Sequence, residues 1–146
     1  MSVSGGCQCG AVRFRVETGE ASICHCRMCQ KATGGFFGPY VEAKKGTLTW
    51  TRGEPKRFRS SNKVQRGFCG DCGTPLTFEG DSGLVGLSIG SFDDPAPLKP
   101  TVQLGSPEKL PWVDDLHAVH ERQQSEAEIV KYMDGLESHQ HPDHDT

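Results

Sequence analysis

The residues best suited to chemistry are three cysteines that fall within six positions, in the stretch Cys24–Cys29 (Cys-His-Cys-Arg-Met-Cys). Four more cysteines form two close pairs, Cys7 with Cys9 and Cys69 with Cys72. No cysteine is isolated, and seven thiols cannot all pair as internal disulfides. Clustered thiols of this kind bind soft metal ions or carry redox chemistry.

The seven thiols divide naturally into four and three. Structural zinc sites use four ligands, whereas catalytic zinc sites keep one position for water or substrate. The sequence Cys-Gly-Asp-Cys-Gly at 69–73 has the form of a zinc knuckle, and an extended Cys-x-Cys at 7–9 could supply two more ligands. We therefore predict two zinc ions per chain, a structural one on Cys7, Cys9, Cys69 and Cys72 and a catalytic one on Cys24, Cys26 and Cys29.

Two other arrangements of the thiols stay open. Cys26 and Cys29 could join Cys69 and Cys72 in a ribbon-type site, which would leave three cysteines unused. The C-x-x-C pairs could also be redox dithiols, although the βαβ pattern that carries such a motif in thioredoxin-like folds is absent. We favour the division into four and three because it leaves no stray cysteine.

Length and charge narrow the class of protein. A chain of 146 residues suits one compact domain, and its formal net charge of −3 offers no basic footprint for nucleic acid. We expect no membrane partner, because no apolar stretch approaches the length of a membrane span. The N-terminus lacks the features of a secretory signal, so we expect a cytoplasmic protein whose thiols stay reduced.

Alternating apolar and polar residues predict a mainly β fold of antiparallel strands. Val12–Val16 and Thr47–Thr51 show the alternation most clearly. Further strands are predicted at 36–43, 56–60, 64–69, 75–79, 84–89 and 101–104, with a turn at 18–20 and a short helical turn at 30–33. Pro39 indicates that the strand at 36–43 lies at an edge or contains a bend. Strands and helices do not alternate along the chain, which argues against a doubly wound parallel sheet.

The C-terminal region predicts one short helix and a tail. Ser125 and Glu128 form a capping-box pattern, and apolar residues follow at helical spacing up to about Gly135. We predict a zinc-binding domain over 1–122, a C-terminal helix within 123–136, and a disordered tail over 137–146. The histidines of the tail, His139, His141 and His144, are expected to be solvated and not bound to metal.

Three segments carry a family resemblance: Gly-Cys-Gln-Cys-Gly-Ala-Val-Arg-Phe at 6–14, Cys-His-Cys-Arg-Met-Cys-Gln-Lys at 24–31, and Arg-Gly-Phe-Cys-Gly-Asp-Cys-Gly-Thr-Pro-Leu at 66–76. They resemble the glutathione-dependent formaldehyde-activating enzyme family, which includes centromere protein V-type domains. The resemblance implies an Mss4-like β-tent and the same four-and-three division of zinc ligands. It also implies reversible addition of glutathione to formaldehyde, formally a carbon–sulfur lyase reaction. Gln103 stands where many members have a histidine.

A mechanism follows from a zinc ion with an open position. Such an ion binds a substrate thiol and lowers its pKa, and the thiol then attacks a small aldehyde. His25, Arg27, Lys31 and Arg66 are tentative substrate contacts, with charge screening of the zinc–thiolate centre as the alternative for the cations. The rival function is a non-catalytic zinc module that binds a protein partner, and metal or redox sensing is a smaller possibility. The chain could be a monomer or a homodimer.

Overall fold

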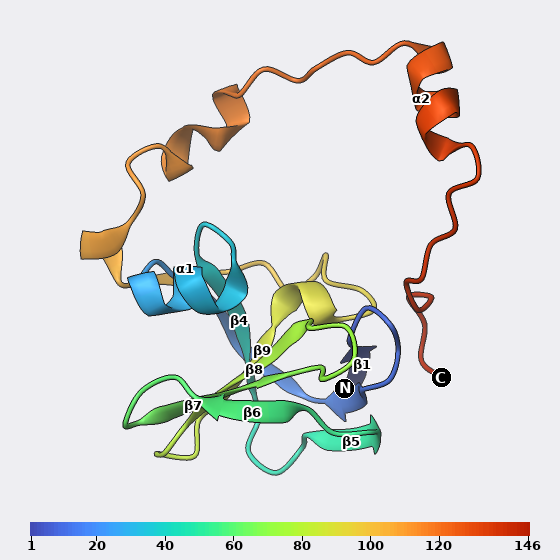
Figure 1. Cartoon of the computed structure of the whole chain (residues 1–146). Helices are drawn as coiled ribbons and strands as arrows, with labels where there is room; N and C mark the ends of the chain where they lie inside the picture. The colour runs from blue at the N-terminus through green and yellow to red at the C-terminus, as the bar shows by residue number, and fades with distance from the viewer.

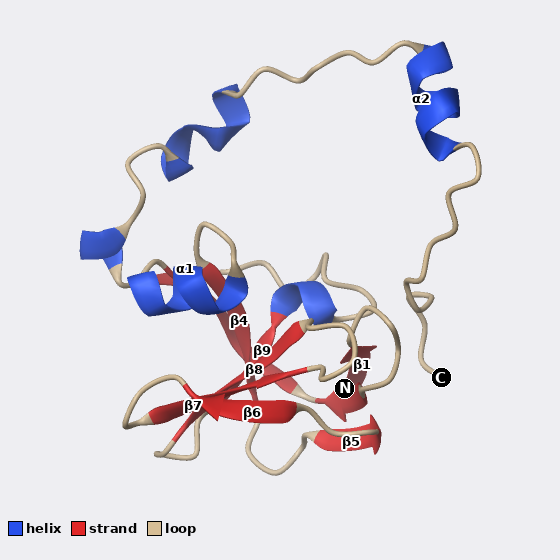
Figure 2. Cartoon of the chain, in the orientation of Figure 1, coloured by secondary structure: helices blue, strands red, loops and turns tan.

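The structure is a computed structural model that describes all residues, 1–146, and it confirms the mainly β fold with a short C-terminal helix (Figure 2). The strands are β1 (Val3–Gly6), β2 (Arg13–Val16), β3 (Thr18–Cys24), β4 (Gly38–Ala43), β5 (Thr49–Arg52), β6 (Lys56–Arg59), β7 (Val64–Phe68), β8 (Pro75–Gly80), β9 (Val85–Ser88) and β10 (Val102–Leu104). The helices are α1 (Arg27–Thr33) and α2 (Glu126–Met133), and short 3-10 turns cover Ile89–Ser91, Ser106–Glu108 and Val113–Ala118.

Two sheets form the body. The smaller has the order β1-β2-β5, and the larger has the order β10-β3-β4-β9-β8-β7-β6. All neighbours are antiparallel except β10, which runs parallel to β3. Helix α1 follows β3 directly and lies next to β4 (Figure 1).

The strand register separates the two faces of the larger sheet. One row of opposed residues is apolar and is buried on the inner face, with Ala21 opposite Val41 and Val41 opposite Leu87. Side chains alternate between faces along a strand, so their neighbours Ser22, Tyr40 and Ser88 form a row on the other face. The outer face therefore carries the side chains with hydroxyl groups.

The core lies between the two sheets. Phe14 of β2 is fully buried and contacts the rings of Trp50 and Phe92 edge to face, with centroids 5.9 and 5.1 Å apart. Leu76 and Leu87 are also fully buried. Edge-to-face aromatic pairs add about 1 kcal/mol each to the free energy gained by burial. Cys7 and Cys69 belong to the same core cluster, so this packing positions the β1–β2 turn and the β7–β8 turn that carry them.

Three local expectations are corrected. Residues 18–20, expected to be a turn, begin strand β3, because the chain pairs with β4 through an irregular register there. Helix α1 begins at Arg27, earlier than the expected turn at 30–33. Pro39 suggested an edge strand or a bend, yet β4 is central; Pro39 precedes the part of β4 that pairs with β9, so the missing N–H is tolerated.

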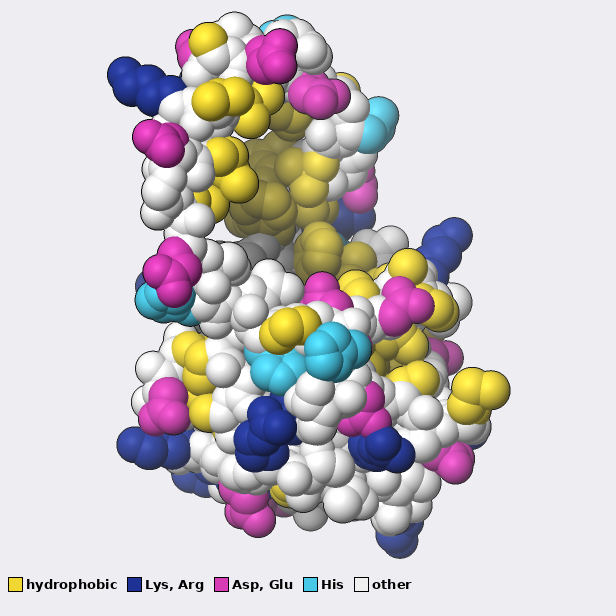
Figure 3. Space-filling view, turned by 90° about the vertical axis from the view of Figure 1, so that its right-hand side faces the viewer, with side chains coloured by type: hydrophobic (Ala, Val, Ile, Leu, Met, Phe, Trp, Pro, Cys, Tyr) yellow, Lys and Arg dark blue, Asp and Glu magenta, His cyan; other side chains and the backbone are white.

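Residues 105–136 form an arm that leaves the body and returns to it. The arm carries exposed apolar side chains, and hydrophobic side chains gather on its inner side (Figure 3). Beyond the arm, the tail contacts the turn that holds Cys9: the N–H of His141 donates to the carbonyl of Gln8 at 2.6 Å. No tail histidine joins a cysteine cluster. The domain boundaries and the disorder of 137–146 stay predictions.

Candidate metal centres

The structure gathers the cysteines as four and three (Cys7, Cys9, Cys69 and Cys72 in one cluster, Cys24, Cys26 and Cys29 in the other). Within each cluster all the sulfur atoms lie within 4.8 Å of one another. None forms a disulfide. The alternative ribbon-type grouping, which needs Cys26 and Cys29 beside Cys69 and Cys72, is not formed.

The four-cysteine cluster joins two turns that are distant in the sequence. Cys7 and Cys9 lie between β1 and β2, and Cys69 and Cys72 lie between β7 and β8. The sulfur of Cys9 is 3.6 Å from that of Cys7 and 3.9 Å from that of Cys69. Four thiolates around a tetrahedral zinc ion stand about 3.8 Å apart. The spacing therefore fits a tetrahedral metal ion of that size.

Backbone geometry favours thiolates in this cluster. The N–H of Val12 donates to the sulfur of Cys7 at 3.3 Å, and that of Asp71 donates to the sulfur of Cys69 at 3.4 Å. Gly73 has φ +82°, a conformation that glycine adopts readily. The Cys-x-Cys segment at 7–9 was expected to be extended. It is instead a tight turn, in which the N–H of Gly10 donates to the carbonyl of Cys7.

The pKa of Cys72 falls to about 6. Burial opposes this shift, but hydrogen bonds from the hydroxyl and the backbone of Thr74 outweigh it. The hydroxyl oxygen of Thr74 lies 3.1 Å from the sulfur. Because a metal ligand must be deprotonated, Cys72 is prepared for binding at neutral pH.

The three-cysteine cluster is local. Cys24 ends β3, Cys26 is the N-cap residue of α1, and Cys29 lies in its first turn. The N–H of Cys29 donates to the sulfur of Cys26 at 3.3 Å. Burial raises the pKa of Cys26. The hydrogen bond from the backbone of Cys29 and those from the thiols of Cys29 and Cys24 outweigh burial, so the net pKa is lowered. Three thiols leave one position of a tetrahedral ion without a protein ligand.

Arg66 lies buried behind this cluster. Its guanidinium donates to the sulfur of Cys29 at 3.4 Å, to the hydroxyl of Tyr40 at 2.8 Å and to the hydroxyl of Ser60 at 2.9 Å. It also lies over the ring of Phe78, 5.1 Å from the centroid. Burial raises the pKa of Cys29 to about 12 although Arg66 acts in the opposite direction. All of these hydrogen bonds go to protein atoms.

His25 is not part of the cluster formed by the cysteines on either side of it. Its imidazole is buried, and Nε2 lies 2.9 Å from Oε1 of Gln103. Its backbone N–H donates to the carbonyl of Leu104 at 2.8 Å. His25 and Gln103 thereby hold the end of β10 against the cysteine loop.

The two remaining predicted contacts lie on α1. The guanidinium of Arg27 donates to Oε1 of Gln30, and its backbone N–H donates to Glu108, both at 2.5 Å. Lys31 is exposed and lines a shallow hollow with Phe58 and Arg59. This hollow does not include any of the three cysteines.

A cavity of about 260 Å³ adjoins the three-cysteine cluster. Its residues are Glu20, Ser22, Cys24, Cys29, Tyr40, Glu42, Phe78, Leu84, Gly86, Val102 and Leu104. Sequence reasoning missed Tyr40 and Phe78 as site residues. The period-two alternation of β4 could have placed Tyr40 on the face opposite Val41, but Phe78 comes from a strand that no local signal places nearby. The cavity reaches Cys24 and Cys29 but not Cys26, and Cys7 of the other cluster lines a separate hollow of about 220 Å³.

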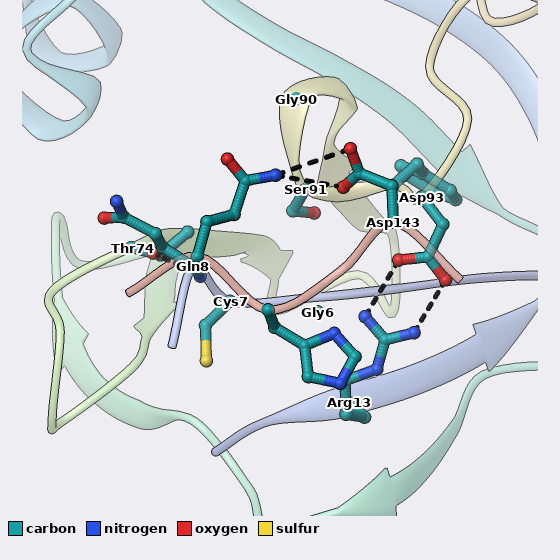
Figure 4. Close-up of a pocket in the computed structure, with 12 residues that line it drawn as sticks. Gly6, Cys7, Gln8, Arg13, Thr74, Gly90, Ser91, Asp93 and Asp143 are labelled. Carbon is teal, nitrogen blue, oxygen red and sulfur yellow. Dashed lines mark hydrogen bonds and ion pairs between the residues drawn. The ribbon is translucent and has the colours of Figure 1, made fainter. Parts of the chain in front are cut away.

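A second hollow lies beside Cys7, where the C-terminal tail crosses the body (Figure 4). It holds the ion pair of Arg13 with Asp93, whose atoms are 2.6 Å apart. Arg13 also donates to the carbonyl of His144.

In the chain as a whole, no helix is both long and apolar enough to cross a membrane.

Known proteins share the fold of this chain and a family pattern in its sequence. The fold resembles the crystal structure of a Rhodobacter sphaeroides protein from a structural genomics programme, with a TM-score of 0.56 and 22% sequence identity over 68% of this chain and 98% of that one. The comparison with curated protein sequences found no match. The family model described as glutathione-dependent formaldehyde-activating enzyme matches residues 2–105, which include all seven cysteines. The chain belongs to the glutathione-dependent formaldehyde-activating enzyme family.

Proposed function

We propose that this protein is a zinc enzyme that adds a small-molecule thiol to formaldehyde or a similar small carbonyl; glutathione is the thiol that the family description names. The reaction is reversible, and its reverse direction is a carbon–sulfur lyase reaction. The observation that carries the proposal is the contrast between the clusters. Four thiols complete one coordination sphere, whereas three thiols beside a cavity leave room for a substrate.

The donor sets support zinc as the metal in both places. Thiolates are soft ligands, and tetrahedral sites built from sulfur alone suit zinc or iron–sulfur clusters. We assign Cys7, Cys9, Cys69 and Cys72 to a structural zinc and Cys24, Cys26 and Cys29 to a catalytic zinc. When bound there, zinc supplies a positive charge that lowers the pKa of a coordinated substrate thiol.

The residues around the cavity have separate roles in this proposal. Arg66 offsets the negative charge that three thiolates leave on a divalent ion, and we assign it this role in place of substrate contact. Tyr40 accepts a hydrogen bond from Arg66, and its own proton has no acceptor within the protein. Burial raises the pKa of Tyr40 to about 12 although Arg66 acts the other way, so the hydroxyl is protonated at neutral pH.

The chemical step joins the thiol sulfur to the carbonyl carbon. The substrate thiol gives its proton to solvent, its sulfur attacks the carbonyl carbon, and a carbon–sulfur bond forms. The electrons of the broken C=O π bond move to oxygen. The Tyr40 hydroxyl donates its proton to this oxygen and is reprotonated from solvent.

The proposal is tested by measuring exchange between formaldehyde, a thiol and the S-hydroxymethyl adduct by NMR. The reaction without protein is appreciable, so the control is Cys26→Ser at equal concentration. We expect faster exchange with the unaltered protein and the background rate with the variant. Equal rates for both proteins with every thiol tried would overturn the proposal and favour the non-catalytic zinc module.

A further inference from the structure

The shape of the cavity follows from the outer face of the larger sheet. Ser22 of β3 lies opposite Tyr40 of β4, and Glu42 lies opposite Gly86 of β9. Gly86 in turn lies opposite Phe78 of β8. A Cβ at Gly86 would lie 3.3 Å from the Cβ of Tyr40. The rings of Tyr40 and Phe78 contact each other with centroids 5.8 Å apart, and the missing side chain at Gly86 leaves open the space over the strand beside them.

The walls of this cavity are apolar and its volume is small. Phe78 and Leu84 form one side, and Val102 and Leu104 form the other. The volume of about 260 Å³ lies below the range of about 300–1,000 Å³ that is usual for sites of drug-sized ligands. A ligand that enters this cavity and brings its sulfur to Cys24 and Cys29 places its body against these walls.

The charges around the cavity are negative. The only charged side chains that line it are Glu20 and Glu42, and both are exposed. Arg66 is not among the lining residues, and its hydrogen bonds are used by protein atoms. No cation is thus available to bind a carboxylate of the substrate inside the cavity.

The cations in the neighbourhood do not fill this gap. The guanidinium of Arg27 is held by Gln30, and Lys31 lines a different hollow. Lys109 pairs with Asp114 at 2.7 Å. A substrate carboxylate in the cavity would therefore lose hydration without gaining a partner, which is costly, and it would face two carboxylates of the protein.

Glutathione carries two carboxylates and one ammonium group, so it is an anion at neutral pH. We propose that the thiol substrate of this protein is instead a compact thiol with an apolar body and no negative charge. A neutral or ammonium-bearing end would point to the rim formed by Glu20 and Glu42. This inference rests on the proposed function, and it narrows the substrate class of the same site.

The test uses three thiols that share a three-carbon body and differ in charge: 3-mercaptopropionate, 3-mercapto-1-propanol and 3-aminopropane-1-thiol. Glutathione is the fourth ligand. Each is titrated into cobalt-substituted protein, in which thiol binding alters the visible absorption, and each is also assayed with formaldehyde. We expect the neutral and cationic thiols to bind at least about tenfold more tightly than the anionic ones.

Each thiol has its own acidity, and this acidity is the same whichever protein variant is present. Comparing variants therefore isolates the effect of the protein's charged side chains on thiol binding. Glu20→Gln with Glu42→Gln should reduce the discrimination between the cationic and anionic thiols by about threefold to tenfold. Glu42→Lys should reduce it further. Glu54→Gln changes an exposed glutamate between β5 and β6 and is the matched control; it should change nothing. Added salt should weaken the discrimination in the unaltered protein.

The outcomes distinguish the two proposals. If glutathione binds as tightly as the neutral thiol, or if the glutamate variants leave the discrimination unchanged, the substrate class is wrong while the enzyme proposal stands. If no thiol alters the cobalt spectrum and none is turned over, the proposed function itself fails. Tight binding of the neutral and cationic thiols, weakened selectively by the Glu20 and Glu42 changes, supports the inference.

Discussion

The guanidinium of Arg66 contacts the sulfur of Cys29 at 3.4 Å from inside the protein. The two residues are 37 positions apart in the sequence. Arg66 lies on β7 of the larger sheet and Cys29 in the first turn of α1. A divalent ion held by three thiolates has a net charge of −1. Arg66 places a compensating positive charge where bulk water does not screen it.

The first prediction concerns this charge. Arg66→Met should lower the metal affinity of the three-cysteine cluster by about tenfold to a hundredfold, because partners outside the ligand set commonly have effects of this size. Arg66→Lys keeps the charge but loses the hydrogen-bond pattern, so its loss should be smaller. Affinity is measured by competition with a chromophoric chelator. Arg59→Met is the control, since Arg59 is exposed and pairs only at the surface with Asp81. Unchanged affinity in Arg66→Met would exclude charge compensation.

The second prediction is an asymmetry between the clusters. Cys7 and Cys9 are about sixty positions from Cys69 and Cys72, so metal binding there stabilises the fold as a whole. Cys24, Cys26 and Cys29 lie in one local loop. Cys72→Ser should lower the melting temperature sharply or give insoluble protein, whereas Cys26→Ser should stay folded.

Metal analysis completes this comparison. The unaltered protein should contain two zinc ions per chain, and Cys26→Ser should contain one and be inactive. Melting curves must be recorded without chelator, because removing both metals would hide the difference. Equal destabilisation by the two substitutions would mean that the three-cysteine cluster is structural. A folded and active Cys72→Ser would mean that the roles of the clusters are reversed.

The third prediction concerns the ion pair of Arg13 and Asp93, whose side chains are 3% and 12% exposed. Burial raises the pKa of Asp93, but hydrogen bonds from Arg13 and Ser4 outweigh it and lower the net pKa. A carboxyl group with a lowered pKa in the folded state stabilises the protein above its unfolded pKa, about 3.9, and this contribution is lost only as the pH falls below that value. Asp93→Asn should therefore lower the free energy of unfolding by about 3 kcal/mol at neutral pH.

Denaturant unfolding checks both the size and the pH dependence of this effect. The difference between Asp93→Asn and the unaltered protein should be constant between pH 5.5 and pH 8, where the metal clusters can stay loaded. Asp94→Asn, at the exposed neighbouring position, is the control. A difference that shrinks steadily from pH 8 to pH 5.5 would show that another group titrates in place of Asp93.

The grouping of the cysteines into clusters of four and three could be predicted from the sequence, because their number and local spacing suffice. Three cysteines in one loop and two pairs in tight turns allow few partitions, and the four-and-three division accounts for all of them. The extended backbone predicted at 7–9 was wrong, because the segment forms a turn. The predicted grouping of Cys7 and Cys9 with Cys69 and Cys72 was nevertheless correct. Cysteine chemistry thus tolerates an error in local structure.

The cavity could not be predicted, because its walls depend on strand order. Tyr40 and Phe78 become neighbours only when β9 inserts between β4 and β8, and Val102 joins them because β10 pairs in parallel with β3. Such pairings are set by the core as a whole. The contact between Arg66 and Cys29 also depends on strand order. Arg66 lies close to Cys69 in the sequence, and this closeness does not predict that its side chain faces Cys29.

The last prediction concerns Tyr40, whose hydroxyl is held by Arg66 at 2.8 Å and whose ring lines the cavity. Tyr40→Phe keeps the ring, so the cavity and the metal content should be unchanged. It removes the proton donor that we assign to the carbonyl oxygen. We expect kcat to fall by about a hundredfold or more, as for the loss of other positioned acids, with thiol affinity in the cobalt-substituted protein unchanged.

The chain offers a matched control, because its one other tyrosine, Tyr132, is exposed on α2. Tyr132→Phe should leave both rate and binding unaltered. If Tyr40→Phe lowers thiol affinity and metal content in parallel with the rate, the hydroxyl supports the cluster through Arg66. If the variant is fully active, the proton comes from solvent, because a hydroxyl that is absent cannot supply it. A loss confined to kcat would leave proton donation as the role of Tyr40, since neither metal retention nor thiol binding depends on it.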